Sequence, residues 1–235
     1  MNKNGERPQP IPFDEIAHRY DLLNRLLSFR IDQLWRRKLV RNLPKGEQYH
    51  ILDVATGTAD LALMAARLNG CRVTGCDVSE KMMAIGRKKA SNHKLDQKVT
   101  LVSGAAENLP FDSDSFDAAM VAFGVRNFND LEKGLAEMYR VLKPGGKILV
   151  LEFSIPRNAV FRAIYLFYFL KLLPFMGGLI SGNRRAYEYL PESVMKFPQG
   201  KDFLMLLQNA GFNNTASQML TLGIATLYQG IKPIK

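Results

Sequence analysis

The chain has 235 residues, is 47% hydrophobic and carries a formal net charge of +10 at pH 7. That length predicts one domain, or one domain with an elaboration, and the hydrophobic fraction is sufficient for a full core. The positive charge favours an anionic partner such as nucleic acid, a phospholipid surface or an acidic protein, and a solvated basic surface fits equally well. The three histidines, His18, His50 and His93, are too scattered in the sequence to predict a metal site.

The N-terminal region has two parts. Residues 1–12 are polar and proline-rich, which predicts a disordered tail without the apolar core of a signal peptide. Helical spacing of apolar residues then predicts a helix over Phe13–Leu27. There are two interpretations of this helix and the segment that follows it. Either they only pack against the rest of the protein, or they form an N-terminal helical lid over a ligand (residues 13–45) in which Tyr20 is an aromatic contact.

A second helix is expected over Asp32–Leu43, with Trp35 on its apolar side and the basic residues, among them Arg36, elsewhere.

The stretch from His50 to Leu63 predicts a buried strand, a tight turn of small residues around Gly57, and the start of a helix. Such a turn exposes backbone N–H groups at a helix N-terminus, and small side chains let a ligand approach them. A second strand is expected to end at Asp77, 20 residues after Gly57. An acid at that place binds a ribose diol in nucleotide-binding α/β folds. The alternative is that Gly57 only shapes a turn and Asp77 only caps the following helix.

Further along the chain, strand and helix patterns alternate, which predicts a doubly wound, mostly parallel sheet. The expected elements are a helix over Glu80–Ala90, strands over Lys98–Ser103 and Ser115–Ala122, a helix over Asp130–Leu142, a strand over Lys147–Phe153, a helix over Lys201–Ala210, and a hairpin of Asn213–Met219 with Gly223–Gln229. Cys71 and Cys76 should lie on opposite faces of one strand because their separation is odd, so we expect no disulfide between them. Two unpaired cysteines suggest a reducing compartment.

Residues 156–198 interrupt this alternation and predict a helical insertion. Within it, Phe161–Ile180 is apolar nearly all round but is broken by Arg162, Lys171 and Pro174, so it lacks the run of about 20 apolar residues that a spanning helix needs. It is either a buried helix or one that contacts a membrane or a long apolar ligand. Its many aromatic residues favour the second interpretation.

Together these motifs resemble class I S-adenosylmethionine-dependent methyltransferases. The matching residues are Asp53, Ala55, Gly57 and Ala59 at the first turn, Asp77, Phe116-Asp117, and Leu142-Lys143-Pro144-Gly145-Gly146. A narrower resemblance is to the menaquinone/ubiquinone biosynthesis C-methyltransferases. It rests on Phe13–Phe29 with Trp35-Arg36-Arg37, Phe123-Gly124-Val125-Arg126-Asn127, Arg140–Ser154, Tyr189–Ser193 and Leu222–Ala225.

The resemblance implies a Rossmann-like α/β fold: a central, mostly parallel seven-stranded sheet with an antiparallel C-terminal strand and helices on both faces. It implies one methyltransferase domain over residues 13–235 and S-adenosylmethionine as the cofactor. The cofactor-binding positions that it indicates are Asp53, Gly57, Thr58, Asp77, Ala105 and Ala106. The chain departs from the family pattern at Arg30 and Ala59, where glycine is usual, at Ala105, where an acid or amide is common, and at Ala122, where serine is frequent.

The activity that the resemblance implies is methylation of a ring carbon of a demethylmenaquinol, giving menaquinol. The alternatives are a benzoquinol precursor of ubiquinone as acceptor, or a scaffold that keeps the fold without activity. An RNA methyltransferase and an NAD-dependent oxidoreductase fit less well, because no amino-methylation motif and no full G-x-G-x-x-G is present.

Two residues are catalytic candidates. A ring carbon becomes nucleophilic when a ring hydroxyl ionises, and a cation that faces this oxygen lowers the pKa of the hydroxyl. We assign this role to Arg126, acting on the phenolate directly or through a water since arginine is too basic to remove a proton, with Asn127 as a hydrogen-bond donor beside it. The structural alternative for Arg126 is a salt bridge to Asp130 or Glu132.

The partners follow from the substrate. An isoprenoid quinol carries a long apolar tail, for which Phe161–Ile180 is the candidate groove, and the basic surface favours an anionic bilayer. We therefore expect a cytoplasmic protein that is peripheral at the inner face of the membrane, with no nucleic acid partner. The oligomeric state is left open.

Overall fold

The computed structural model describes residues 30–44, 46, 48–68, 70–172 and 184–234. The predicted tail over 1–12, the helix over Phe13–Leu27 and Tyr20 lie outside these residues.

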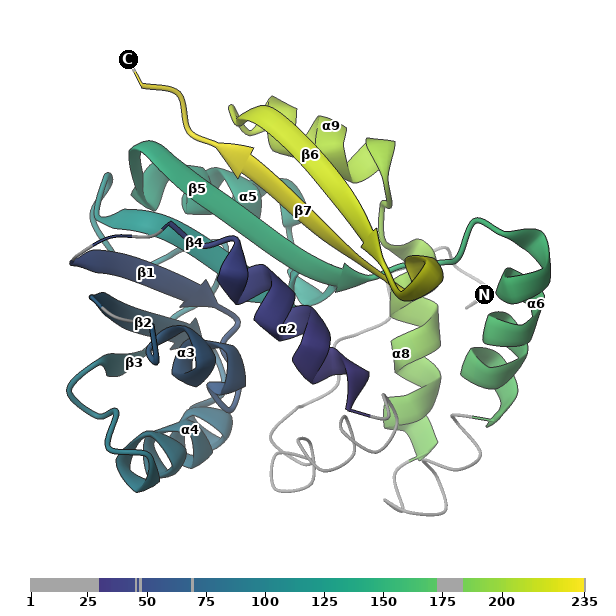
Figure 1. The fold of residues 1–235 in the computed structure, drawn as a ribbon, viewed down its shortest axis with the longest axis horizontal. Helices are drawn as coiled ribbons and strands as arrows, with labels where there is room; N and C mark the ends of the chain where they lie inside the picture. Colours follow the sequence, from purple (N-terminus) through teal and green to yellow (C-terminus); the bar gives the residue numbers. More distant parts are fainter. Residues whose placement is uncertain (1–29, 45, 47, 69, 173–183, 235) are drawn as a thin grey trace.

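Seven strands form one sheet in the described part of the chain, in the order β3-β2-β1-β4-β5-β7-β6 (Figure 1). Their bounds are β1 Tyr49–Val54, β2 Cys71–Asp77, β3 Val99–Ser103, β4 Phe116–Ala122, β5 Leu142–Phe153, β6 Asn213–Leu220 and β7 Ala225–Ile231. The first five strands are parallel, and β7 is antiparallel to both β5 and β6. The predicted sheet, with its antiparallel C-terminal strand, is confirmed.

Helices cover both faces of the sheet, as predicted. On one face lie α2 (Ile31–Arg41), α3 (Asp60–Ala65) and α4 (Glu80–Asn92), and on the other lie α5 (Leu131–Val141) and α9 (Lys201–Asn209). Two helices, α6 (Ala159–Phe167) and α8 (Arg184–Lys196), lie beyond the carboxyl ends of the central strands (Figure 1). These ends are where open α/β sheets bind their ligands.

The sheet separates two hydrophobic cores. Because side chains alternate along a strand, Cys71 packs into the core under α2 and α3, whereas Cys76 packs into the core under α5 and α9. Both thiols are buried and unpaired, so the prediction that they do not form a disulfide is confirmed.

The fifth strand begins earlier than predicted, at Leu142 instead of Lys147. Leu142 pairs in parallel with Phe116, and the glycines that follow exchange backbone hydrogen bonds with Lys232 at the end of β7. The Lys-Pro-Gly-Gly segment therefore ends α5, as expected, and also extends the sheet.

Part of the apolar stretch Phe161–Ile180 is described, as α6 and one π-helical turn over Tyr168–Leu172. None of the helices among the described residues is both long enough and apolar enough to cross a bilayer.

Candidate active site

The turn after β1 has an unusual backbone. Ala55, Gly57 and Ala59 all adopt positive φ, at 52°, 55° and 64°, so three left-handed residues occur within five positions. Glycine tolerates this conformation and alanine does so at a cost, which is why small residues occupy the turn. The turn is tied to β2, because Thr56 N donates to the carbonyl of Cys76 at 3.1 Å.

Asp77 joins this turn to the second strand. Its carboxylate accepts a hydrogen bond from Gly57 N at 2.7 Å and another from Ser79 N at 2.8 Å. The residue that caps α4 is Ser79, whose hydroxyl accepts from Met82 N, so the cap predicted for Asp77 as an alternative belongs to Ser79. The structure thus brings Gly57 and Asp77 together at one edge of the sheet.

The side chains of Asp53 and Thr58 stabilise the turn from within. Asp53 is buried, and its carboxylate accepts a hydrogen bond from the Thr56 hydroxyl at 2.6 Å. Burial raises the pKa of Asp53 to about 7, against the opposing effects of that hydrogen bond and of the charge on Arg36. Thr58 Oγ1 accepts a hydrogen bond from Lys89 Nζ at 2.9 Å. 

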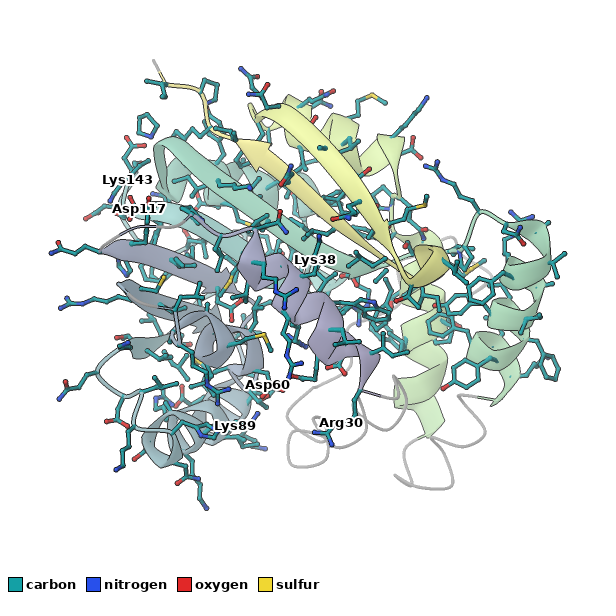
Figure 2. All side chains as sticks on the ribbon, viewed as in Figure 1. Arg30, Lys38, Asp60, Lys89, Asp117 and Lys143 are labelled. Carbon is teal, nitrogen blue, oxygen red and sulfur yellow. The ribbon has the colours of Figure 1, made fainter. Side chains whose placement is uncertain are left out.

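Lys89 also forms an ion pair with Asp60 at 2.7 Å, and Figure 2 shows these two side chains together between α3 and α4. The turn is therefore held in place from three elements.

The loop after β3 completes this edge. Gly104 N donates to the carbonyl of Asp77 at 3.0 Å, which places Ala105 and Ala106 next to the second strand. Ala106 is buried and Ala105 is half-buried. Val78, a residue that the sequence analysis passed over, is 72% exposed beside Asp77 and offers an apolar surface at the same edge.

Arg126 lies in the short 3-10 helix Val125–Asn127 that follows β4, and its side chain is only 5% exposed. It forms an ion pair with Glu152 of β5, with 2.8 Å between Arg126 Nη1 and Glu152 Oε1. The alternative prediction of a salt bridge to Asp130 or Glu132 is wrong, because the carboxylate partner is Glu152, supplied by the neighbouring strand.

The remaining contacts fix the plane of the guanidinium group. Arg126 Nη1 also donates to the carbonyl of Phe123 at 2.5 Å, and Nε donates to the Ser193 hydroxyl at 3.3 Å. Among the described residues, Nη2 makes no hydrogen bond. The arginine thus keeps one pair of donors for an oxygen of a ligand.

Helix α8 reaches into the site through two residues. Tyr189 donates from its hydroxyl to Asn127 Oδ1 at 2.9 Å, and burial raises the pKa of this tyrosine. Ser193 holds Arg126, as described above. Both catalytic candidates are therefore positioned by the same helix, which the sequence analysis identified only as part of a family motif.

An aromatic cluster, formed by Trp35, Phe123, Phe153, Tyr165 and Phe169, reaches the guanidinium group through Phe153. The rings of Phe123 and Phe153 lie 4.5 Å apart between centroids, and Arg126 Cζ lies 5.5 Å from the centroid of Phe153. Burial also raises the pKa of Tyr165, whose hydroxyl is buried without a hydrogen-bond partner in the described part of the chain. A cation beside an aromatic cluster suits a flat ring with oxygen substituents.

Sequence reasoning missed Glu152, although it quoted the strand that contains it. The available signal was a carboxylate that follows the apolar run Ile148–Leu151 in this strand, since a buried acid needs a partner. Glu152 is fully buried and accepts hydrogen bonds from Arg126 Nη1 and from the backbone N–H groups of Arg126 and Phe153.

Comparison with known protein families identifies the family of this chain. The model of the ubiE/COQ5 methyltransferase family matches residues 2–232. The chain belongs to this family. The resemblance inferred from the sequence motifs is thereby confirmed.

Relatives match over nearly the whole chain. A ubiquinone/menaquinone biosynthesis C-methyltransferase UbiE of Geobacter sulfurreducens is 46% identical over 100% of this chain and 92% of its own length. A demethylmenaquinone methyltransferase of Thermus thermophilus is 49% identical over 94% of this chain and 100% of its own length.

Solved structures agree with the fold. Phosphoethanolamine N-methyltransferase 2 of Haemonchus contortus in complex with S-adenosyl-L-methionine aligns with a TM-score of 0.63 at 17% identity, covering 84% of this chain and 52% of that one. The [4+2]-cyclase SpnF aligns with a TM-score of 0.68 at 19% identity, covering 97% of this chain and 99% of that one. Because a cyclase shares the architecture, the fold by itself does not identify the reaction.

Proposed function

We propose that the protein transfers the methyl group of S-adenosylmethionine to a ring carbon of a demethylmenaquinol, an isoprenoid naphthoquinol, and so produces menaquinol. The observation that carries the proposal is the buried cation Arg126, which lies over the Phe153 ring at the carboxyl ends of the strands in a chain of this family. The naphthoquinol is favoured over a benzoquinol because the similar Thermus protein is a demethylmenaquinone methyltransferase.

The residues at the β1, β2 and β3 ends fit S-adenosylmethionine. Asp77 supplies a carboxylate acceptor for the ribose, and small residues keep the backbone of the β1 turn accessible. Gly57 has a φ of 55°, which strains any larger residue, and a Cβ added there would come within 3.3 Å of Met82 Cε on α4. Ala105, Ala106 and Val78 offer the adenine an apolar surface and backbone groups.

The sulfonium supplies a methyl group that already carries a good leaving group, so no metal or covalent nucleophile is needed. What the protein must do is align the acceptor carbon and make the ring nucleophilic. A phenol normally ionises near pH ~10, and the Arg126 Nη2 donors stabilise the phenolate that activates the ring. With S-adenosylmethionine bound, the ring carbon would form a bond to the methyl carbon while the carbon–sulfur bond breaks, S-adenosylhomocysteine would be released, and the ring proton would pass to water.

Glu152 sets the orientation of Arg126 in this scheme. The ion pair, the Phe123 carbonyl and Ser193 hold Nη1 and Nε, so that the guanidinium cannot rotate and Nη2 keeps its direction. Asn127, anchored by Tyr189, offers its amide beside the arginine. We expect Arg126→Ala to abolish most of the methyl transfer.

The direct test is an assay with labelled S-adenosylmethionine that offers a reduced demethylmenaquinol analogue and a reduced demethylubiquinol analogue side by side. Label in the naphthoquinol product supports the proposal. Label only in the benzoquinol product would show that the acceptor is a benzoquinol and not a naphthoquinol. Label in neither, with both acceptors confirmed as reduced, refutes the activity.

We further propose that α6 brings the protein to an anionic membrane, where the tailed substrate resides. Val160, Ile164, Phe167 and Leu170 recur on one side of this segment and are exposed, whereas Tyr165 on its inner side joins the aromatic cluster. Residues 155–172 include Arg157, Arg162 and Lys171 and no acid. Each well-placed cation adds about 1 kcal/mol of attraction to an anionic bilayer.

Flotation with phospholipid vesicles tests the membrane proposal. We expect binding to vesicles that contain phosphatidylglycerol, little binding to pure phosphatidylcholine, and loss of binding in Phe167→Glu. Met205→Glu, on an exposed position of α9, is the matched control and should float like the wild type. No binding to anionic vesicles at low salt refutes the proposal.

A further inference from the structure

Arg36 of α2 is a nearly buried cation with one hydrogen-bond donor, Nε, that has no acceptor among the described residues. Its side chain is 12% exposed, and its Nε atom is buried with no hydrogen-bond partner among the described residues. The nearest carboxylate oxygen in an ion pair, Asp32 Oδ2, is 3.7 Å from Nε, which is too long for a hydrogen bond. A buried charged donor without an acceptor is costly, so this arrangement indicates an anion from outside the described part of the chain, such as a bound ligand.

The position of Arg36 narrows the choice of anion. Its guanidinium carbon lies 5.2 Å from the centroid of Phe123, the residue that directly follows β4. At the next residue, a Cβ added to Gly124 would come within 2.7 Å of the Ala55 Cβ, so this segment packs against the turn after β1. Arg36 is also close enough to Asp53 for its charge to lower the pKa of that buried carboxyl. Arg36 therefore faces the ends of β1 and β4, beside the proposed cofactor turn.

We propose that Arg36 binds the α-carboxylate of the methionine portion of S-adenosylmethionine, an inference that rests on the cofactor assigned above. This carboxylate is the one anionic group of that molecule, and a guanidinium can bind a carboxylate through two parallel hydrogen bonds. The acids facing Arg36 are Asp32 and Asp53. Because the amino-acid portion is a zwitterion, its entry adds one charge of each sign and leaves the local net charge unchanged.

The experiment compares two ligands that differ only in the carboxylate: S-adenosylhomocysteine and decarboxylated S-adenosylhomocysteine. Titration calorimetry gives the Kd of each for the wild type and for Arg36→Met. We expect Arg36→Met to weaken S-adenosylhomocysteine binding by roughly 10- to 100-fold and to leave the Kd of the decarboxylated ligand within about threefold, as loss of a charged hydrogen bond predicts. The matched control is Arg37→Met, at an exposed position of the same helix, which should change neither Kd.

The Kd values show whether Arg36 binds the carboxylate. Unchanged binding of S-adenosylhomocysteine by Arg36→Met overturns the assignment, and so does an equal loss for the two ligands, since that indicates a general role in the fold. If Arg36→Met does not fold, Arg36→Lys takes its place and should weaken only the carboxylate-bearing ligand, by several-fold, because lysine lacks the paired donors. A wild type that binds neither ligand refutes the proposed cofactor, which is a result distinct from failure of Arg36 alone.

Discussion

The Arg126–Glu152 ion pair gives the sharpest prediction, because both side chains are buried and Arg126 is the one cation paired with this carboxylate among the described residues. Glu152→Gln preserves the shape of the side chain and removes the charge that faces a guanidinium only 5% exposed. Removing one partner of a buried pair costs about 3–5 kcal/mol, since it leaves the other charge uncompensated. For a chain of this length, we expect the Tm to fall by roughly 6–20 °C.

A double-mutant cycle measures this coupling. Urea unfolding of the wild type, Glu152→Gln, Arg126→Gln and the double variant gives four free energies of unfolding. We expect the double variant to recover at least half of the loss in Glu152→Gln while methyl transfer stays lost. The control is Glu80→Gln, which breaks the exposed pair with Arg87 and should cost less than about 1 kcal/mol. If the two single losses simply add, within about 0.5 kcal/mol, the pair is not coupled and the reasoning is refuted.

Three further predictions concern the turns and the buried acid. Asp77→Asn should weaken S-adenosylhomocysteine binding by roughly 10-fold or more, and an unchanged Kd in calorimetry would contradict its ribose role. Arg30 caps α2 at φ 61°, so Arg30→Gly should raise the free energy of unfolding by about 1 kcal/mol, whereas the same change at Arg37 inside the helix should lower it by a similar amount. The folded protein keeps a proton on Asp53 that the unfolded chain loses above pH ~4, so the stability from this group is lost as pH rises through about 7. This loss lowers the free energy of unfolding of the wild type by about 4 kcal/mol between pH 4 and 8, as measured by urea unfolding, and Asp53→Asn should not show it. If the free energies of unfolding of wild type and Asp53→Asn change in parallel with pH, the buried proton on Asp53 is contradicted.

Local patterns in the sequence were enough to predict most of the fold. Alternating strands and helices predicted the sheet, because hydrophobic periodicity and turn residues act within a few positions along the chain. The pairing of Gly57 with Asp77 was also predictable, since consecutive parallel strands place their carboxyl ends side by side. Arg30 and Ala59, where the family resemblance led us to expect glycine, have φ of 61° and 64°, a left-handed conformation that favours glycine.

The contacts that the sequence did not reveal join residues that are distant along the chain. Glu152 meets Arg126 across 26 positions, and Tyr189 meets Asn127 across 62, through a helix whose placement no periodicity determines. The second predicted helix was expected to keep Arg36 away from its apolar side. The structure instead packs this arginine over Phe123, because the long aliphatic stem of arginine tolerates burial.

The most direct test of the central claim is the identity of the bond formed by the transferred methyl group. S-adenosylmethionine labelled with ¹³C in its methyl group is incubated with the protein and a demethylmenaquinol analogue, once reduced and once oxidised, and the product is examined by NMR. We expect a labelled methyl group on a ring carbon, formed from the reduced acceptor only. A labelled methoxy group, or equal labelling of the oxidised quinone, would contradict it.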